Sequence, residues 1–234
     1  MAGNGRADPW TGAADQPVMP WRGRITTSIA ADRAGSPAGT AAAENEVAAF
    51  FGTARASDFS REGDEIRYSG PDEWSYRRFI LHYAHLCAAA GGIDAFLIGS
   101  EMVGLTQIQG ADHRFPAVEQ LIRLAADVRA ILGDAVKIGY ASDWSEYFGY
   151  HPGNGDVFFH LDPLWSDDNI DFVGIDNYMP LSDWREGENH LDAAWGRIDN
   201  PAYLRANVAG GEGFDWYYAR DVDREMQILS LIHI

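Results

Sequence analysis

The sequence has few cysteines, few lysines and no long apolar run. Its one cysteine, Cys87, excludes an internal disulfide and any metal site built from several cysteines. No apolar stretch approaches the roughly 20 residues that cross a bilayer, and the N-terminal residues lack the apolar core of a signal peptide. Lys137 is the single lysine among 18 basic residues, which face 35 acidic ones and leave a net charge of −17. Nucleic acids and anionic membranes attract clustered cations, so neither is an expected partner.

What is present is typical of a globular protein rich in aromatic residues. Of the 234 residues, 46% are hydrophobic and 23% are charged, which is close to ordinary globular composition. Aromatic residues make up 12% of the chain and include 8 tryptophans. Aromatic faces in a cleft hold sugar rings in many proteins, whereas most aromatic side chains simply fill a core. Both interpretations stay open at this point.

Apolar spacing predicts an alternation of strands and helices. Three mostly apolar runs that end in polar residues are predicted as buried parallel strands, at 93–99, 135–140 and 170–176. Helices are predicted from Ser69-Gly-Pro-Asp-Glu-Trp74 to Gly91-Gly92 and from Pro116 to Gly133. The rest is predicted as loops over 1–20, 29–43 and 53–70, a short strand over 21–28, short helices over 44–51 and within 156–166, a polar excursion over 180–211 and a helix over 213–227.

Alternating strands and helices are typical of a parallel α/β sheet, either doubly wound or closed as a barrel. No glycine-rich phosphate loop follows a strand, which weakens the nucleotide-binding architecture. Instead the strands end in Ser100-Glu101-Met102, Asp143-Trp144 and Asp176-Asn177-Tyr178, and barrel enzymes place their chemistry at such ends. Only about four strands can be counted against the eight of a full barrel. The predicted fold class is therefore an incomplete (β/α)₈ TIM barrel, with central βα units present and first and last strands missing.

Glu101 is the leading candidate for catalysis. It follows the strand at 93–99, at the end where barrel enzymes hold their reacting groups. Cleavage of a glycosidic bond needs one carboxylic acid to protonate the leaving oxygen and a second carboxylate as nucleophile or as base for a water. Apolar surroundings raise the pKa of such an acid. The alternative, from position alone, is a helix-capping or salt-bridged glutamate at a strand–loop junction.

Other polar and aromatic residues are candidates for substrate binding. Asp143 and Asp176 are placed to orient a sugar hydroxyl or to tune Glu101, although aspartate in such positions also caps helices and turns. The remaining candidates are side chains that can stack on or hydrogen-bond a sugar, or that can equally belong to the core: Trp144, Asn177, Tyr178 and Trp216. Glu212 is flanked by glycines and is interpreted as part of a flexible loop before a helix.

Metal and covalent chemistry have no support in the sequence. The seven histidines show no paired i, i+4 spacing and have no cysteine partners, so no metal ion or other cofactor is expected. No Gly-x-Ser-x-Gly motif is present, and Cys87 lies inside the apolar face of a predicted helix.

Five motifs occur in an order that resembles a known family: Pro20-Trp-Arg-Gly-Arg-Ile-Thr26, Phe96-Leu-Ile-Gly-Ser-Glu-Met102, Lys137-Ile-Gly-Tyr-Ala-Ser-Asp-Trp144, Asp171-Phe-Val-Gly-Ile-Asp-Asn-Tyr178 and Gly210-Gly-Glu-Gly-Phe-Asp-Trp-Tyr-Tyr218. The chain resembles the TIM-barrel-like domain of the large tail protein of gene transfer agents and related phages, also called the host-specificity or baseplate multidomain protein. The resemblance covers residues 1–227, as one partial glycoside-hydrolase-like barrel. Residues 228–234 resemble translated read-end sequence and are expected to be a non-native tail.

The resemblance implies a glycan-facing barrel at the tail tip of a phage-like particle assembled in the bacterial cytoplasm. Its expected partners are a cell-envelope polysaccharide and other tail or baseplate proteins. In related hydrolases the acid/base glutamate follows the fourth strand, which matches Glu101, although Ser100 stands where many of them have asparagine. Their second carboxylate ends the seventh strand, expected downstream of this chain. A non-catalytic glycan- or receptor-binding module and a purely structural block of the baseplate are the alternatives.

Overall fold

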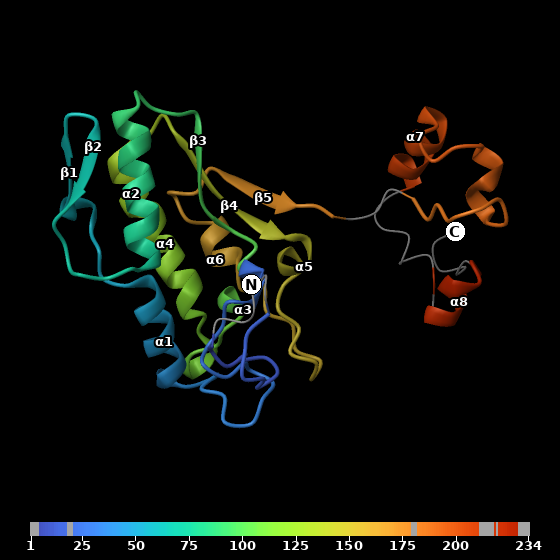
Figure 1. Cartoon of the computed structure of the whole chain (residues 1–234), viewed down its shortest axis with the longest axis horizontal. Coiled ribbons are helices and arrows are strands. Elements are labelled where there is room, and N and C mark those ends of the chain that lie inside the picture. The colour runs from blue at the N-terminus through green and yellow to red at the C-terminus, as the bar shows by residue number, and fades with distance from the viewer. Residues whose placement is uncertain (1–4, 18–20, 179–181, 211–217, 219, 229–234) are drawn as a thin grey trace. The chain divides into compact units, whose positions relative to one another are not determined.

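The structure is a computed structural model that describes residues 5–17, 21–178, 182–210, 218 and 220–228. It divides into two compact units, Met1–Asp176 and Asn177–Ile234. Figure 1 labels the helices and strands. In chain order the elements are η1 (Arg22–Arg24), α1 (Ala41–Phe51), η2 (Ala56–Asp58), β1 (Phe59–Glu62), β2 (Glu65–Tyr68), α2 (Tyr76–Ala89), β3 (Ala95–Ser100), α3 (Val103–Thr106), η3 (Ala111–His113), α4 (Pro116–Leu132), β4 (Lys137–Asp143), α5 (Trp144–Tyr147), α6 (Asp162–Trp165), β5 (Phe172–Asp176), η4 (Leu191–Trp195), α7 (Pro201–Gly210) and α8 (Asp221–Glu225).

The first unit is built on a three-stranded parallel sheet in the order β3-β4-β5. This confirms the predicted parallel α/β sheet, and each strand overlaps its predicted range. Among the described residues no further strand joins this sheet and no closed barrel forms. The TIM-barrel-like architecture is consistent with the parallel order, and the incomplete eight-unit barrel stays a prediction.

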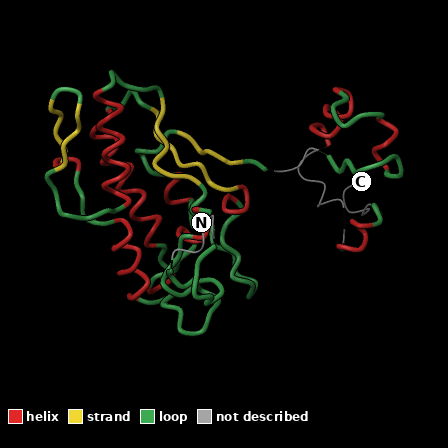
Figure 2. Tube along the Cα trace, in the orientation of Figure 1, coloured by secondary structure: helices red, strands yellow, loops and turns green. Residues whose placement is uncertain are grey.

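Two long helices lie together on one side of the sheet, as Figure 2 shows. Helix α4 begins with Pro116 in its first turn and ends at Gly133, whose φ of 80° suits glycine. The apolar faces of α2 and α4 meet the sheet in one core, whose fully buried members include Leu81, Leu121, Leu124, Ile98 and Ile138. Burial of this kind, about 25 cal/mol per Å² of apolar surface, is the main force that holds the layers together.

The predicted strand over 21–28 is wrong. Residues Arg22–Arg24 form the short helix η1 instead. A Cβ atom on Gly23 would lie 2.4 Å from the Trp21 ring, so the backbone turns directly beneath the indole. The Trp21 ring packs against Gly23, and the backbone there forms a helical turn where an extended strand was predicted.

The predicted loop over 53–70 contains a β-hairpin. Strands β1 and β2 pair antiparallel, with Glu62 opposite Glu65, and so leave Gly63 and Asp64 as a two-residue turn. Gly63 has a φ of 63°, which a two-residue hairpin turn requires and glycine adopts without strain. The hairpin packs beside α2.

Helices α1, α2 and α6 correspond to predicted helices, with shifted ends. Helix α2 begins at Tyr76, later than predicted, because Ser75 accepts a hydrogen bond from the Arg78 N–H as its N-cap. Helices α1 and α6 lie at the predicted places, and the predicted polar excursion holds η4 and α7. The helix predicted over 213–227 is α8 in its described part, while 211–217 and 219 lie outside the described residues.

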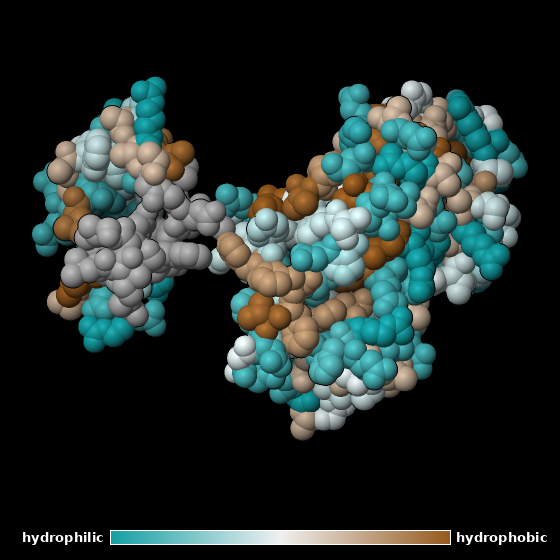
Figure 3. Space-filling view, turned by 180° about the vertical axis from the view of Figure 1, so that it is seen from behind, coloured by the Kyte–Doolittle hydropathy of each residue, from teal (hydrophilic) through white to brown (hydrophobic). Residues whose placement is uncertain are grey.

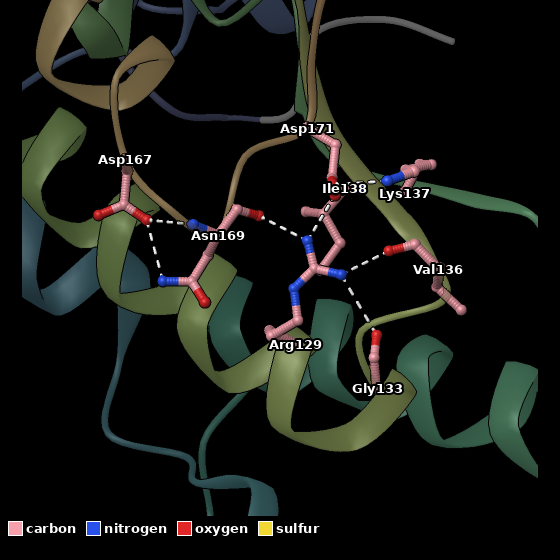
Figure 4. A network of polar contacts seen from close by, with 8 residues as sticks. All are labelled: Arg129, Gly133, Val136, Lys137, Ile138, Asp167, Asn169 and Asp171. Atoms are coloured by element: carbon pink, nitrogen blue, oxygen red, sulfur yellow. Dashed lines mark hydrogen bonds and ion pairs between the residues drawn. The ribbon is translucent and has the colours of Figure 1, made fainter.

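A polar network fastens the N-terminal edge of the sheet (Figure 4). The guanidinium of Arg129, on α4, donates hydrogen bonds to the carbonyls of Val136 and Asn169 and forms an ion pair with Asp171. Asp171 also accepts a hydrogen bond of 2.8 Å from the Ile138 N–H. The Ile138 N–H, followed by Arg129, holds the pKa of Asp171 well below its usual range. This network ties α4 to both β4 and the segment that enters β5.

The surface mixes apolar and polar side chains, as Figure 3 shows. Val173 and Ile175 of β5 pair in register with the buried Tyr140 and Ser142, yet they are 46% and 43% exposed.

In the described part of the chain, no helix has the length and apolar character needed to cross a membrane.

Candidate functional site

The carboxyl ends of β3, β4 and β5 bring three acidic residues to one edge of the sheet. Asp143 and Asp176 are direct partners in the register of β4 and β5. Glu101 follows β3, and its backbone N–H donates a hydrogen bond of 2.8 Å to the carbonyl of Ala141. The structure therefore groups three of the residues that the sequence selected as candidates.

The backbone of Glu101 is unusual. Between Leu97 and Ser100 the register of β3 against β4 shifts, because Leu97 faces Gly139 whereas Ser100 faces Ala141. Such bulges commonly redirect a side chain beside an active site. Glu101 then takes a φ of 52°, in the left-handed region. For a residue other than glycine this conformation costs about 1–2 kcal/mol, and strain of this kind clusters at functional sites.

The Glu101 side chain is held by two residues far away in the sequence. The Trp21 Nε1–H donates a hydrogen bond of 2.9 Å to Oε2, and an Arg22 nitrogen lies 2.8 Å from the same oxygen. Only 4% of Glu101 is exposed. The salt-bridged glutamate that position alone allowed is thus what the structure shows.

Asp176 contacts Glu101 directly. Burial raises the pKa of Asp176, and the negative charge of Glu101 and a side-chain hydrogen bond with it raise that pKa further. Two acids in hydrogen-bond contact are closer than the about 5 Å that separates the catalytic pair of a retaining glycosidase. Asp176 therefore lies too close to Glu101 to act as its nucleophilic partner.

Asp143 is engaged as a helix cap. Its carboxylate accepts a hydrogen bond of 2.9 Å from the Ser145 N–H and caps α5, as the alternative interpretation expected. Trp144, the first residue of α5, is 37% exposed.

The other candidate residues follow β5 in the chain. Asn177 and Tyr178 are exposed and belong to the second unit. Trp216 and Glu212 lie outside the described residues.

A cavity of about 450 Å³ adjoins the Glu101 contacts. Its lining combines two indoles with two guanidinium groups and an acid, and includes Asp8, Trp10, Gln16, Trp21, Arg22 and Arg24. The Arg22 side chain is 51% exposed. An apolar ring face beside several hydrogen-bonding groups is what a sugar ring needs. Trp21 and Arg22 were not identified as site residues from the sequence, because 21–28 was predicted as a strand.

The left-handed conformation of Glu101 can be tested by two substitutions that remove the same side-chain contacts. We expect Glu101→Gly to be more stable than Glu101→Ala by about 1 kcal/mol, because glycine reaches a positive φ without strain. Urea unfolding followed by circular dichroism measures the difference. The same pair at Glu119, inside α4, should favour alanine by about 1 kcal/mol. Equal stability of the two Glu101 variants would contradict the strain.

A second group of buried polar residues lies beside the site and was also missed. Glu146 is fully buried, and its burial raises the pKa of the carboxyl to about 7. His160 is 2% exposed, and burial lowers its pKa to about 4. The sequence Asp143-Trp-Ser-Glu146 has the spacing of a capping box, which both residues form, so a local signal for Glu146 existed. Among the described residues, no three His, Cys, Asp or Glu side chains are grouped to hold a metal ion.

Comparison with known proteins gives one match. A family model described as "GTA TIM-barrel-like domain" matches residues 74–233, which is more than half of the chain. The matched range includes all three strands of the parallel sheet and the acidic residues at their carboxyl ends. No curated protein matches the chain.

Proposed function

The chain belongs to the family of gene transfer agent (GTA) TIM-barrel-like domains, and on that basis we propose that it is a glycan-facing part of a particle's tail tip. In this proposal the acidic edge of the sheet binds a cell-envelope polysaccharide, and Glu101 is the acid/base group of a glycoside hydrolase. Other tail or baseplate proteins are its partners in the particle, which is assembled in the bacterial cytoplasm.

The observation that carries the proposal is the way Glu101 is held. A group that transfers a proton to a glycosidic oxygen must be fixed in direction. Glu101 is 4% exposed, and both Trp21 and Arg22 bind its carboxyl at the strand ends where barrel enzymes react. The strained backbone of Glu101 agrees with a functional position.

The chemistry assigns one role to each nearby group. Glu101 protonates the leaving oxygen and then accepts a proton from the attacking water. Asp176, in hydrogen-bond contact with Glu101, has a raised pKa, so it can hold a proton next to the Glu101 carboxyl. Trp21 and Arg22 line the adjacent cavity and are placed to contact the sugar. The nucleophile is the carboxylate expected at the end of the seventh strand.

A second candidate function is glycan or receptor binding without turnover. It is favoured by the ion pair of Glu101 with Arg22, because a guanidinium at 2.8 Å stabilises the carboxylate form rather than the acid. In that case the same cavity holds a sugar, and the acidic residues act as hydroxyl ligands.

Glu101→Gln separates these functions. In a protein that includes the seventh-strand carboxylate, we expect the variant to release reducing ends from purified cell-envelope polysaccharide at least about 100-fold more slowly than the parent protein, because general acid catalysis is lost. Glycan binding, measured by tryptophan fluorescence, should be largely kept. Glu65→Gln, on the exposed hairpin, is the matched control and should change neither.

The outcomes are distinct. Binding by both proteins without turnover supports the binding module. Turnover by Glu101→Gln at the parent rate overturns the assignment of Glu101. Absence of both binding and turnover on every polysaccharide tested rejects the glycan-facing proposal and leaves a structural block of the tail.

A further inference from the structure

Four buried side chains form one polar network behind the site. Tyr140 on β4, Glu146 on α5 and Thr106 on α3 are all fully buried, and His160 is 2% exposed. The hydroxyl of Tyr140 lies 2.9 Å and that of Thr106 lies 2.5 Å from Oε1 of Glu146, and both donate to it. His160 Nε2 lies 3.3 Å from the Thr106 hydroxyl oxygen. The Glu146 carboxyl therefore joins α5 to both β4 and α3 through hydrogen bonds.

This network reaches the backbone next to Glu101. The Met102 N–H donates a hydrogen bond of 2.9 Å to the hydroxyl of Tyr140. The Glu101 N–H is held on the other side by the Ala141 carbonyl. The two peptide N–H groups that flank the strained Glu101 are therefore both fixed, one by the strand ladder and one by a side chain.

We propose that Glu146, acting through Tyr140, is a positioning residue that fixes the Glu101–Met102 peptide and so aims the Glu101 carboxyl at Trp21 and Arg22. The importance of that aim rests on the proposed function. A tyrosine hydroxyl has one proton. Because Tyr140 gives this proton to Glu146, its lone pairs face the Met102 N–H, and the carboxyl sets the direction of the hydroxyl.

Core packing alone does not account for this arrangement. A buried carboxyl loses hydration and stabilises a core less than an apolar side chain of the same volume. Here Glu146 accepts hydrogen bonds from Thr106, Tyr140 and the Asp143 N–H, so its oxygens are used to order surrounding groups. Through Tyr140, these hydrogen bonds extend to the Glu101–Met102 peptide, next to the carboxyl of the candidate acid.

Tyr140→Phe tests the link, with Tyr76→Phe as the matched control. Both tyrosines donate from a largely buried hydroxyl, but that of Tyr76 bonds the carbonyl of Ile98, inside β3, at 2.8 Å. Two NMR readouts report on the peptide: amide hydrogen exchange of Met102 and the indole N–H resonance of Trp21. We expect Tyr140→Phe to speed Met102 exchange about tenfold and to shift the Trp21 resonance. Tyr76→Phe should leave both signals as in the parent protein.

Two variants of Glu146 test its own part. Glu146→Gln keeps an acceptor oxygen for Tyr140 and should leave Met102 exchange within about threefold of the parent. Glu146→Met removes the acceptor and should speed that exchange as Tyr140→Phe does. Unchanged Met102 exchange in Tyr140→Phe, or an equal increase in Tyr76→Phe, overturns the proposal. Glu146→Met and Glu146→Gln with the same exchange rate overturn the role of Glu146.

These readouts need no glycan, so they are independent of the proposed function. A failed turnover experiment with Glu101→Gln leaves the NMR test valid, and unchanged NMR signals leave the turnover test valid. Where turnover is found, Tyr140→Phe should lower kcat more than it raises KM. The substitution displaces the Glu101 carboxyl but keeps the residues that line the cavity.

Discussion

Replacing Arg129 by methionine is expected to lower the free energy of unfolding of the first unit by about 2 kcal/mol, because several partly buried hydrogen-bonding groups lose their donors. The Arg129 side chain is 13% exposed. Its guanidinium lies 2.5 Å from the Val136 carbonyl and 3.2 Å from that of Asn169, and it pairs with Asp171. Methionine keeps the packing of the stem and removes all of these donors (Figure 4).

The matched control is Arg123→Met on the same helix. The Arg123 side chain is 62% exposed, and its ion pair with Glu119 has a distance of 3.8 Å. Exposed pairs of this kind contribute less than about 1 kcal/mol. Urea unfolding of both variants, followed by far-ultraviolet circular dichroism, gives the comparison. Equal stability losses in the two variants would show that the network at the N-terminal edge of the sheet is not a special source of stability.

The parallel sheet could be predicted because its signals are local. Each strand is a short apolar run that ends in polar residues, as in Ile170-Asp-Phe-Val-Gly-Ile-Asp176, and the helix over 116–132 has both a start and a stop signal. The hairpin over 59–68 also had a signal, the Gly63-Asp64 pair between two short segments, that was interpreted as loop. The failed strand at 21–28 depended on the Trp21 ring lying over Gly23, which no periodicity shows.

The candidate site could be predicted only in part. Glu101 was identifiable because it follows a strand, but Trp21, which binds it, lies 80 residues away in the sequence. Spacing along the chain does not say which loop covers which strand end. The left-handed backbone of Glu101 could not be predicted either, because it follows an irregularity in the pairing of β3 with β4 that no local sequence pattern indicates. Long-range packing decides these features.

The buried residues Glu146 and His160 lead to a second large expected effect, two opposed contributions to the pH dependence of the free energy of unfolding. Burial raises the pKa of Glu146 from 4.5 to about 7. Between those pH values the folded protein holds a proton that the unfolded chain has lost. The free energy of unfolding therefore falls by about 3 kcal/mol as the pH rises through this range. Thr106, Tyr140 and Asp143 surround the carboxyl, and the charge of Asp143 also raises its pKa.

His160 acts in the opposite direction. Burial lowers its pKa from 6.5 to about 4, so between those values the unfolded chain holds a proton that the folded protein lacks. The free energy of unfolding therefore rises by about 3 kcal/mol as the pH increases through that range. Between about pH 4.5 and 6.5 the two contributions have opposite sign and similar size, since each changes by about 1.4 kcal/mol per pH unit.

Single substitutions should separate the two opposed pH dependences of the free energy of unfolding. In Glu146→Gln the contribution of His160 is no longer opposed by Glu146, so we expect stability relative to the parent protein to increase with pH from about 4.5 to 7. In His160→Gln the contribution of Glu146 is no longer opposed by His160, so stability relative to the parent protein should decrease with pH from about 4 to 6.5. Urea unfolding at half-unit pH steps measures both slopes against the parent protein, whose other titrating groups are shared. Slopes of the same sign in the two variants would contradict the opposed titration. Opposite slopes would show that a glutamate and a histidine, both adjacent to Thr106, are buried in their neutral forms over the same pH range.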